Sequence, residues 1–110
     1  MIFGERWVAA VVFLVAAVLE VAGDALIRRG LRGGGLVVVA GGFCTLGLYG
    51  VIVNQLRVDF SRLLGAYVGV FAVVSVAVGR FAFGERVPPS TWLGLAVILA
   101  GSLIIHMGRA

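Results

Sequence analysis

The chain has 110 residues, of which 62% are hydrophobic and only 13% are charged. Soluble domains are usually near half apolar and about a quarter charged, so this composition excludes an ordinary water-soluble domain. A hydrocarbon core about 30 Å thick takes roughly 20 helical residues to cross, and four crossings with short turns consume nearly the whole chain. We therefore expect residues 1–110 to form a single four-helix transmembrane domain that is not an enzyme.

The net charge of +4 comes from nine basic and five acidic residues. The basic residues are all arginines, scattered at the ends of apolar segments. This scatter argues against a nucleic-acid partner and is typical of contacts with the headgroups of a lipid bilayer. Cys44 is the single cysteine, which excludes an intramolecular disulfide. No His, Cys and carboxylate residues have metal-ligand spacing, so we expect no metal and no other cofactor.

Four apolar runs are long enough to cross a membrane, and we expect helices over residues 7–27, 36–56, 63–83 and 91–107. Apolar residues run continuously in them instead of alternating, which favours helices over barrel strands. Ser90 follows two prolines and is the expected N-cap of the last helix. The alternative for the first run is a signal peptide, but the run continues past Glu20 to normal helix length. The sequence thus predicts an all-α, multi-pass protein of the inner cell membrane.

An even number of spans places both chain ends on the same side of the membrane. Four arginines belong to that side and five to the other, namely Arg6, Arg57, Arg62 and Arg109 against Arg28, Arg29, Arg32, Arg80 and Arg86. The positive-inside rule therefore selects no orientation, and we expect copies to insert both ways. The alternative is that the cluster before the second span fixes one orientation.

Glu20 is the deepest charged residue, about 5 Å past the middle of the first predicted span. A carboxylate there is costly unless it is protonated, paired or solvated, and such residues usually line a path for ions, protons or substrate. The alternative is a protonated Glu20 that bonds to a neighbouring helix. Ala16 and Gly23 flank it at i−4 and i+3. They leave a groove of small residues that suits a substrate or a closely packed helix.

Asp24 lies one turn after Glu20 on the same helical face. Two carboxylates on one face favour cation binding. Asp24 also lies one turn before Arg28, so a neutralised pair near the membrane surface is the alternative role.

Tyr67, Phe71 and Ser75 recur one turn apart along the third span. An aromatic face near a cation contributes about 0.5 to 2 kcal/mol, so this stripe would complement Glu20 in holding a lipophilic cation. Ordinary packing of the two rings is the alternative. Tyr49 on the second span is a weaker candidate of the same kind.

Paired glycines on the last two spans indicate close helix contacts. Gly65 and Gly69 leave room for a neighbouring helix on the third span. Gly94 and Gly101 are seven residues apart on the fourth. Because lipid supplies no hydrophobic drive between helices, small residues are the usual contact points, and we predict a dimer interface at this second pair.

The run Ala16, Glu20, Gly23 and Arg28 resembles the first helix of the small multidrug resistance family, which carries Ala-x-x-x-Glu-x-x-Gly followed by a basic residue. Further along, the chain matches that family at three more places, which are Tyr67, the link Phe81 to Arg86 that reads Phe-x-Phe-Gly-Glu-Arg, and the pair Gly94 and Gly101. The resemblance implies an antiparallel, dual-topology homodimer that exchanges protons for a cationic substrate at the shared Glu20.

The chain departs from the drug-exporting members of that family at Val70, where they usually have a tryptophan. The stretch from Arg62 to Phe71 looks more like the YnfA-type relatives in the same drug/metabolite transporter superfamily. The resemblance therefore implies the fold, the topology and the role of Glu20, but no specificity for polyaromatic cations. The guanidinium-exporting branch of the family stays an alternative.

These residues favour a proton-coupled antiporter that exports small or lipophilic cations. Two opposed copies would supply what inverted repeats supply in larger transporters, and protons and substrate would bind Glu20 alternately. One alternative is a non-transporting membrane subunit that uses Glu20 as a buried contact with an arginine of its partner. Another is a channel, for which the sequence offers no ring of ligands.

Overall fold

A computed structural model of the chain describes residues 2–108, with side chains from residue 7 onward. The elements are α1 (Ile2–Arg29), η1 (Gly30–Gly34), α2 (Leu36–Val53), α3 (Phe60–Phe81) and α4 (Pro89–Met107), where η1 is a π-helical turn. Within this described part, four helical segments are long and apolar enough to cross a membrane. The all-α, four-span fold predicted from the sequence is confirmed.

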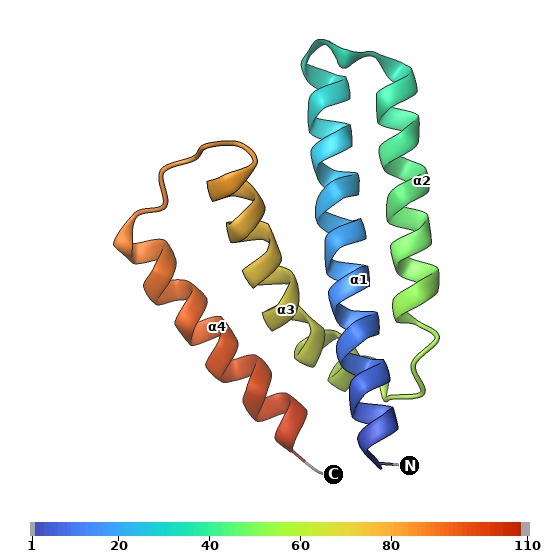
Figure 1. Ribbon diagram of the computed structural model, residues 1–110, viewed down its shortest axis with the longest axis vertical. Helices are drawn as coiled ribbons and strands as arrows, with labels where there is room; N and C mark the ends of the chain where they lie inside the picture. The colour runs from blue at the N-terminus through green and yellow to red at the C-terminus, as the bar shows by residue number, and fades with distance from the viewer. Residues whose placement is uncertain (1, 109–110) are drawn as a thin grey trace. The chain divides into compact units, whose positions relative to one another are not determined.

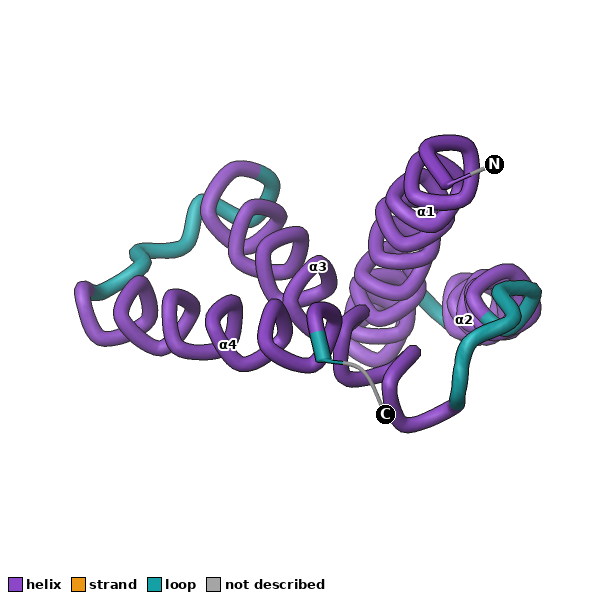
Figure 2. Tube along the Cα trace, turned by 90° about the horizontal axis from the view of Figure 1, so that it is seen from below, coloured by secondary structure: helices purple, strands orange, loops and turns teal. Residues whose placement is uncertain are grey.

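The chain divides into two compact units, Met1–Leu56 and Arg57–Ala110, and each is a helical hairpin. In the first hairpin α1 packs beside α2, and in the second α3 packs beside α4 (Figure 1). Figure 2 shows the same helices as continuous tubes joined by short loops. The single four-helix domain stays a prediction.

Glycines bring α1 and α2 into close contact. A Cβ added at Gly23 would lie 2.7 Å from Leu46 Cγ, and one added at Gly42 would lie 2.7 Å from the Gly23 carbonyl oxygen. Both distances are shorter than a van der Waals contact, so a larger residue would push the helices apart. Gly30 is packed in the same way against Val39, nearer the connection between the helices. The two helices therefore approach each other closely between Gly23 and Gly30.

The first helix is longer than predicted at its end. We expected it to stop near residue 27, but it continues through Arg29, and the turn Gly30–Gly34 that follows leaves helical geometry at Arg32 and Gly33. Gly33 and Gly35 then reverse the chain with φ angles of 112° and 96°. Only glycine adopts such angles without strain, which is why the chain turns there and not at the arginines. Arginines in the last turn also suit the negative end of the helix dipole.

The second helix ends three residues before the prediction, at Val53 rather than residue 56. The Asn54 carboxamide donates a hydrogen bond to the Gly50 carbonyl oxygen at 2.8 Å. The same carbonyl oxygen also accepts from the Asn54 N–H at 3.3 Å, so the side chain adds a second hydrogen bond at the end of the helix. The third helix is shifted by two or three residues at each end and spans Phe60–Phe81 instead of 63–83.

The fourth helix begins two residues before the prediction, at Pro89 instead of residue 91. Pro88 is its N-cap residue, so the prediction of Ser90 as N-cap is wrong. Proline fits the first helical position because its φ is already helical and because the N–H that it lacks would have no partner there.

Ser102 joins α4 to α3 inside the second hairpin. Its buried hydroxyl donates to the Ala66 carbonyl oxygen at 2.6 Å and accepts a hydrogen bond from the Gly69 N–H at 3.2 Å. One turn away, a Cβ added at Gly65 would lie 2.8 Å from Ile105 Cδ1. The close helix approach predicted at these two glycines is confirmed.

The arginines lie at the ends of the helices, where they were expected. Those of the first connection are exposed, and so are Arg57, Arg62, Arg80 and Arg86 of the second hairpin. Arg62 Nη2 donates to the carbonyl oxygen of His106 at 2.8 Å, near the end of α4. Arg109 and the side chain of Arg6 lie outside the described residues. Insertion in both orientations stays a prediction.

Candidate functional site

Glu20 lies inside the first segment that is long and apolar enough to cross a membrane. The segment runs from Trp7 to Gly34, and Glu20 is the fourteenth of its 28 residues. Its side chain is half-buried, while Ala16 and Ala17, one turn before it, are fully buried. A carboxylate at this depth has no water to solvate it from the bilayer itself, so it requires a proton, a cation or a polar partner.

Tyr49 of α2 is a polar neighbour of Glu20 in the first hairpin. The charge of the Glu20 carboxylate acts on the Tyr49 phenol, so the two groups lie within electrostatic range of each other. A phenol donates one hydrogen bond and also accepts, so it can stabilise an ionised carboxylate. Tyr49 was only a weaker candidate in the sequence, although the spacing of two glycines could have indicated its position. If Gly23 and Gly42 meet in antiparallel helices, residues before Gly23 lie opposite residues after Gly42.

Gly23 and Asp24 occupy different surroundings, although both were predicted to belong to the Glu20 site. Gly23 is buried against Leu46 of α2, so on this side a closely packed helix occupies the groove of small residues. Asp24 is exposed on the same helix. Its pairing with Arg28, offered as an alternative, stays a prediction.

The aromatic stripe of the third span is formed inside the second hairpin. The ring centroids of Tyr67 and Phe71 are 6.3 Å apart, and the ring planes are tilted by 36°. Tyr67 is buried and Phe71 is half-buried. Val70, between them, is half-buried and supplies no aromatic surface. That this stripe meets Glu20 around a cation stays a prediction.

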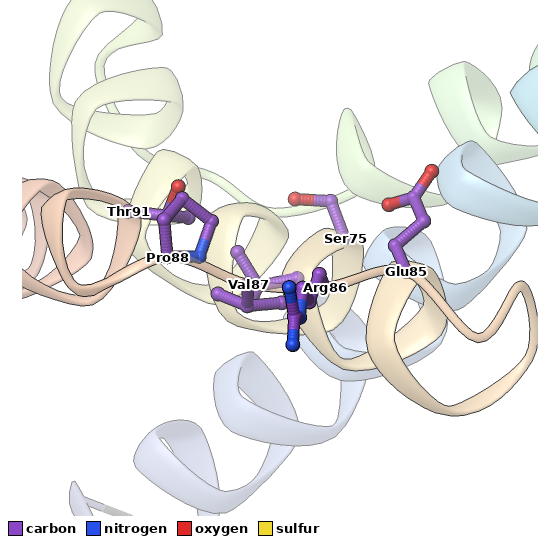
Figure 3. Close-up of a pocket in the computed structure, with 7 residues that line it drawn as sticks. Ser75, Glu85, Arg86, Val87, Pro88 and Thr91 are labelled. Carbon is purple, nitrogen blue, oxygen red and sulfur yellow. The ribbon is translucent and has the colours of Figure 1, made fainter.

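Ser75 lines a pocket of about 180 Å³ at the connection between α3 and α4 (Figure 3). Its hydroxyl donates to the Ala72 carbonyl oxygen at 2.9 Å. The other lining residues are Val76, Glu85, Arg86, Val87, Pro88 and Thr91. Helical spacing grouped Ser75 with the aromatic stripe, but spacing alone does not reveal the course of a loop. Apart from Ser75, the residues of this pocket were not predicted as site residues from the sequence.

Gly94 and Gly101 face open space on α4. Among the described residues, no atom lies within 4 Å of a Cβ added at either position. Leu93 and Ile104 are exposed on the same helix. A helix surface of this kind leaves room for another backbone to approach closely. The dimer interface at these glycines stays a prediction.

The first hairpin thus offers one carboxylate at mid-membrane depth, with a phenol in range of its charge. Such a group accepts a proton or binds a cation, and it does only one of these at a time. In the part of the chain whose side chains are described, no three His, Cys, Asp or Glu residues are grouped as metal ligands.

Comparison with known families decides the wider relationship. A family model described as "Uncharacterised BCR, YnfA/UPF0060 family" matches residues 7–110. The chain belongs to the YnfA/UPF0060 family. A UPF0060 membrane protein of Mycolicibacterium vanbaalenii is 41% identical over 105 residues, which are 91% of this chain and 95% of the relative. A UPF0060 membrane protein of Streptomyces coelicolor is 39% identical over 100 residues, which are 87% of this chain and 88% of that relative.

The YnfA-type resemblance noted in the sequence is therefore confirmed. The YnfA/UPF0060 relatives are named as membrane proteins, which agrees with the four apolar spans of this chain. Both findings support a multi-pass membrane protein. No solved structure matches the chain.

Proposed function

We propose that this YnfA/UPF0060 protein is an antiporter, not an enzyme, that exports small or lipophilic cations across the inner cell membrane in exchange for protons. The observation that carries the proposal is the position of Glu20, the fourteenth of 28 residues in the segment Trp7–Gly34. Ionisable residues at such depth are costly in a bilayer and usually belong to a path for protons or ions. Protons are the coupling ion, and no further cofactor is required.

Exchange follows from competition for one charge. A protonated Glu20 is neutral and holds a cation poorly, whereas the ionised form attracts it. Binding of a cation therefore releases a proton, and protonation from the other side of the membrane releases the cation. Tyr49 would support the ionised form by hydrogen bonding, since its phenol lies in range of the carboxylate charge. In this scheme the proton and the cation bind the same side chain, so Glu20 cannot carry both across the membrane at once.

A second copy of the chain would complete the transport path. Four helices enclose little space, and larger transporters use two inverted repeats around a site at the midplane. Two copies inserted in opposite directions would reproduce that symmetry with their Glu20 side chains facing one cavity. The open surface of α4 at Gly94 and Gly101 supplies a place for the two copies to meet. Tyr67 and Phe71 of each copy would then offer aromatic faces to the cation.

The test is transport by the purified protein in proteoliposomes. A proton gradient is imposed, and the uptake of a quaternary ammonium, a guanidinium and a polyamine compound is measured together with internal pH. We expect cation movement against proton movement, lost in Glu20→Gln and kept in Asp59→Asn, an exposed carboxylate outside the spans. Passive current without proton movement would indicate a channel instead.

Two further outcomes would redirect the proposal. Movement of guanidinium alone would assign the protein to the guanidinium-exporting branch. No movement of any compound, with correctly folded protein, would favour a non-transporting subunit that needs a partner.

A further inference from the structure

The pocket at the α3–α4 connection has no part in the exchange proposed at Glu20. It has a volume of about 180 Å³ and lies within the second hairpin (Figure 3). One carboxylate, one guanidinium and two hydroxyls line it, from Glu85, Arg86, Ser75 and Thr91. Glu85, Arg86 and Thr91 are exposed, so a ligand can reach them. A small pocket with both charges suggests a ligand that also carries both.

The fold holds Glu85 in place although the residue is exposed. Gly84 has a φ of 64° and turns the chain back toward α3. The Glu85 N–H then donates to the Gly79 carbonyl oxygen at 2.9 Å. The Glu85 carboxylate lies on the buried Gly79, where an added Cβ would overlap Oε1 and would lie 3.4 Å from Cδ. The absence of a side chain at Gly79 therefore leaves the space that the Glu85 carboxylate occupies.

The two helix ends give the pocket a negative and a positive side. Because α3 and α4 are antiparallel neighbours, the carbonyl end of α3 and the amide end of α4 lie at the same end of the hairpin (Figure 1). The first carries partial negative charge and the second partial positive charge. Glu85 is attached to the last turn of α3, and Arg86 leads toward α4. In Figure 3 their side chains point in different directions.

Glu85 and Arg86 do not neutralise each other. Among the described residues, no salt bridge is found between the two side chains, which point apart in Figure 3. An exposed ion pair contributes little to stability. A ligand that binds both side chains therefore sacrifices little by keeping them apart. The carboxylate and the guanidinium are therefore both available to groups of opposite charge on one ligand.

The pocket lies where two candidate membrane spans are connected, and we infer that this places it near the lipid headgroups. The connection that forms the pocket joins two segments that are each long and apolar enough to cross a membrane, Phe60–Phe81 and Pro89–Met107. Exposed aromatic rings flank it, Phe81 on one helix end and Trp92 on the other, as is common at membrane interfaces. The Arg80 guanidinium lies 5.7 Å from the centre of the Phe81 ring. At this level the most abundant ligands are phospholipid headgroups.

We propose that this pocket binds the phosphoethanolamine headgroup of a bilayer phospholipid. The primary ammonium group donates hydrogen bonds to the Glu85 carboxylate and the Ser75 hydroxyl oxygen. The phosphate binds the Arg86 guanidinium and the Thr91 hydroxyl, both on the positive side. A choline headgroup has no N–H to donate, so hydrogen bonding at Glu85 distinguishes the two lipids. The site does not depend on the exchange proposed at Glu20.

The test compares lipids retained by the purified full chain. The protein is equilibrated with equal amounts of phosphatidylethanolamine, phosphatidylcholine and phosphatidylglycerol, and bound lipid is counted by native mass spectrometry. Because a hydrogen bond to a charged group is lost with choline, we expect phosphatidylethanolamine to be retained over phosphatidylcholine by about tenfold. Phosphatidylglycerol, which has no ammonium group, should be retained no better than phosphatidylcholine.

Two variants act on the ammonium side of the pocket by different means. Glu85→Gln removes the charge, and Gly79→Ala displaces the carboxylate through the overlap with Oε1. Gly79→Ala moves only the end of a flexible side chain, so helical content measured by circular dichroism should be unchanged. Each variant should reduce the preference for phosphatidylethanolamine to near unity. The matched controls Asp59→Asn and Arg80→Gln, whose residues do not line the pocket, should keep it.

Arg86→Gln acts on the phosphate side and should weaken retention of all three lipids alike. Equal retention of phosphatidylethanolamine and phosphatidylcholine by the unchanged protein would overturn the proposal. So would a preference that survives both Glu85→Gln and Gly79→Ala. Complete displacement of the lipid by free phosphoethanolamine at equal concentration would show that the pocket binds a water-soluble zwitterion, and would overturn the assignment to a lipid.

Discussion

Ser102 of α4 accepts a hydrogen bond from the backbone N–H of Gly69 in α3 at 3.2 Å. The same hydroxyl donates to the Ala66 carbonyl oxygen at 2.6 Å, so one side chain satisfies two backbone groups of the neighbouring helix. The contact requires glycine, because a Cβ added at Gly69 would lie 2.7 Å from Ser102 Oγ. Polar contacts between helices specify alignment in a bilayer, where apolar surfaces do not discriminate.

Ser102→Ala should destabilise the second hairpin by about 1 kcal/mol, because contacts of this type inside membranes contribute about 0.6 to 2 kcal/mol. Gly69→Val should cost more, since it also separates the helices. Unfolding of the purified protein by a denaturing detergent, followed by circular dichroism, measures both effects. Ser90→Ala, an exposed hydroxyl near the start of α4, is the matched control. A loss in Ser90→Ala equal to that in Ser102→Ala would contradict the role given to the buried hydroxyl.

Replacing Glu20 tests the shared site directly. Cation affinity of the unchanged protein should rise with pH, since fewer copies then carry a proton on the carboxylate. Glu20→Gln keeps the shape of the side chain and removes its charge, so cation binding and exchange should vanish while dimerisation survives. Glu20→Asp keeps the charge on a shorter arm and should shift the pH dependence instead of abolishing it. Equilibrium binding of a labelled cation at several pH values provides the measurement.

Asp24→Asn is the comparison for these variants. Asp24 is exposed one turn from Glu20, so its loss should reduce cation affinity less than the loss of Glu20. If Glu20→Gln kept pH-dependent binding and Asp24→Asn abolished it, Asp24 would be the site. No effect of either change would refute the antiporter proposal.

Tyr49→Phe should weaken cation exchange by about tenfold or more without unfolding the protein. The change removes one hydroxyl in range of the Glu20 charge, and a hydrogen bond to a charged group is worth about 1.5 to 3 kcal/mol. Initial rates of exchange in proteoliposomes measure the effect. Thr45→Val is the control, because it removes a hydroxyl from the same helix that bonds only to Gly41 at 2.8 Å. Equal rates in both variants would exclude Tyr49 from the site.

Gly101→Leu should reduce the dimer fraction in detergent while helical content stays unchanged. Within the described part of the chain nothing lies within 4 Å of a Cβ at this position, so the leucine has no clash inside one copy. Cross-linking and light scattering report the dimer. Gly47→Leu, at an equally open position on α2, is the control. An unchanged dimer in Gly101→Leu would move the interface to another helix.

Single cysteines at the two chain ends should react with a membrane-impermeant reagent in intact cells for only part of the protein, and with the remainder after lysis. This follows from the near balance of arginines on the two sides of the spans. Cys44 is exposed and must first be replaced by serine. Labelling from one side alone would defeat dual topology and would require a parallel dimer.

The sequence predicted the number and the type of the helices because apolar runs of this length have one stable arrangement in a bilayer. It predicted their ends less well. The turn after α1 depends on the backbone angles of Gly33 and Gly35, and the start of α4 depends on which proline takes the first helical position. In both places the end of the helix depends on which of several neighbouring glycines or prolines takes a particular position. Hydropathy does not distinguish between these neighbours.

The depth of Glu20 could be predicted because it is a property of one helix. The surroundings of Glu20 could not, because they depend on the alignment of two helices. Tyr49 came into range through the contact of Gly23 with Gly42, which is a matter of register. The pocket at Glu85 requires the turn at Gly84 and the space at Gly79, two positions five residues apart whose relation appears only in three dimensions.

The contact of Gly23 with Gly42 has a mechanical consequence. Leu46 and Ile27 also pack tightly against the two glycines, so the helices cannot slide without losing close contacts of both backbone and side chains. During a transport cycle α1 and α2 would therefore move as one rigid body. Glu20 and Tyr49 would travel together through every state, and the carboxylate would carry its polar surroundings with it as access alternates between the two faces of the membrane.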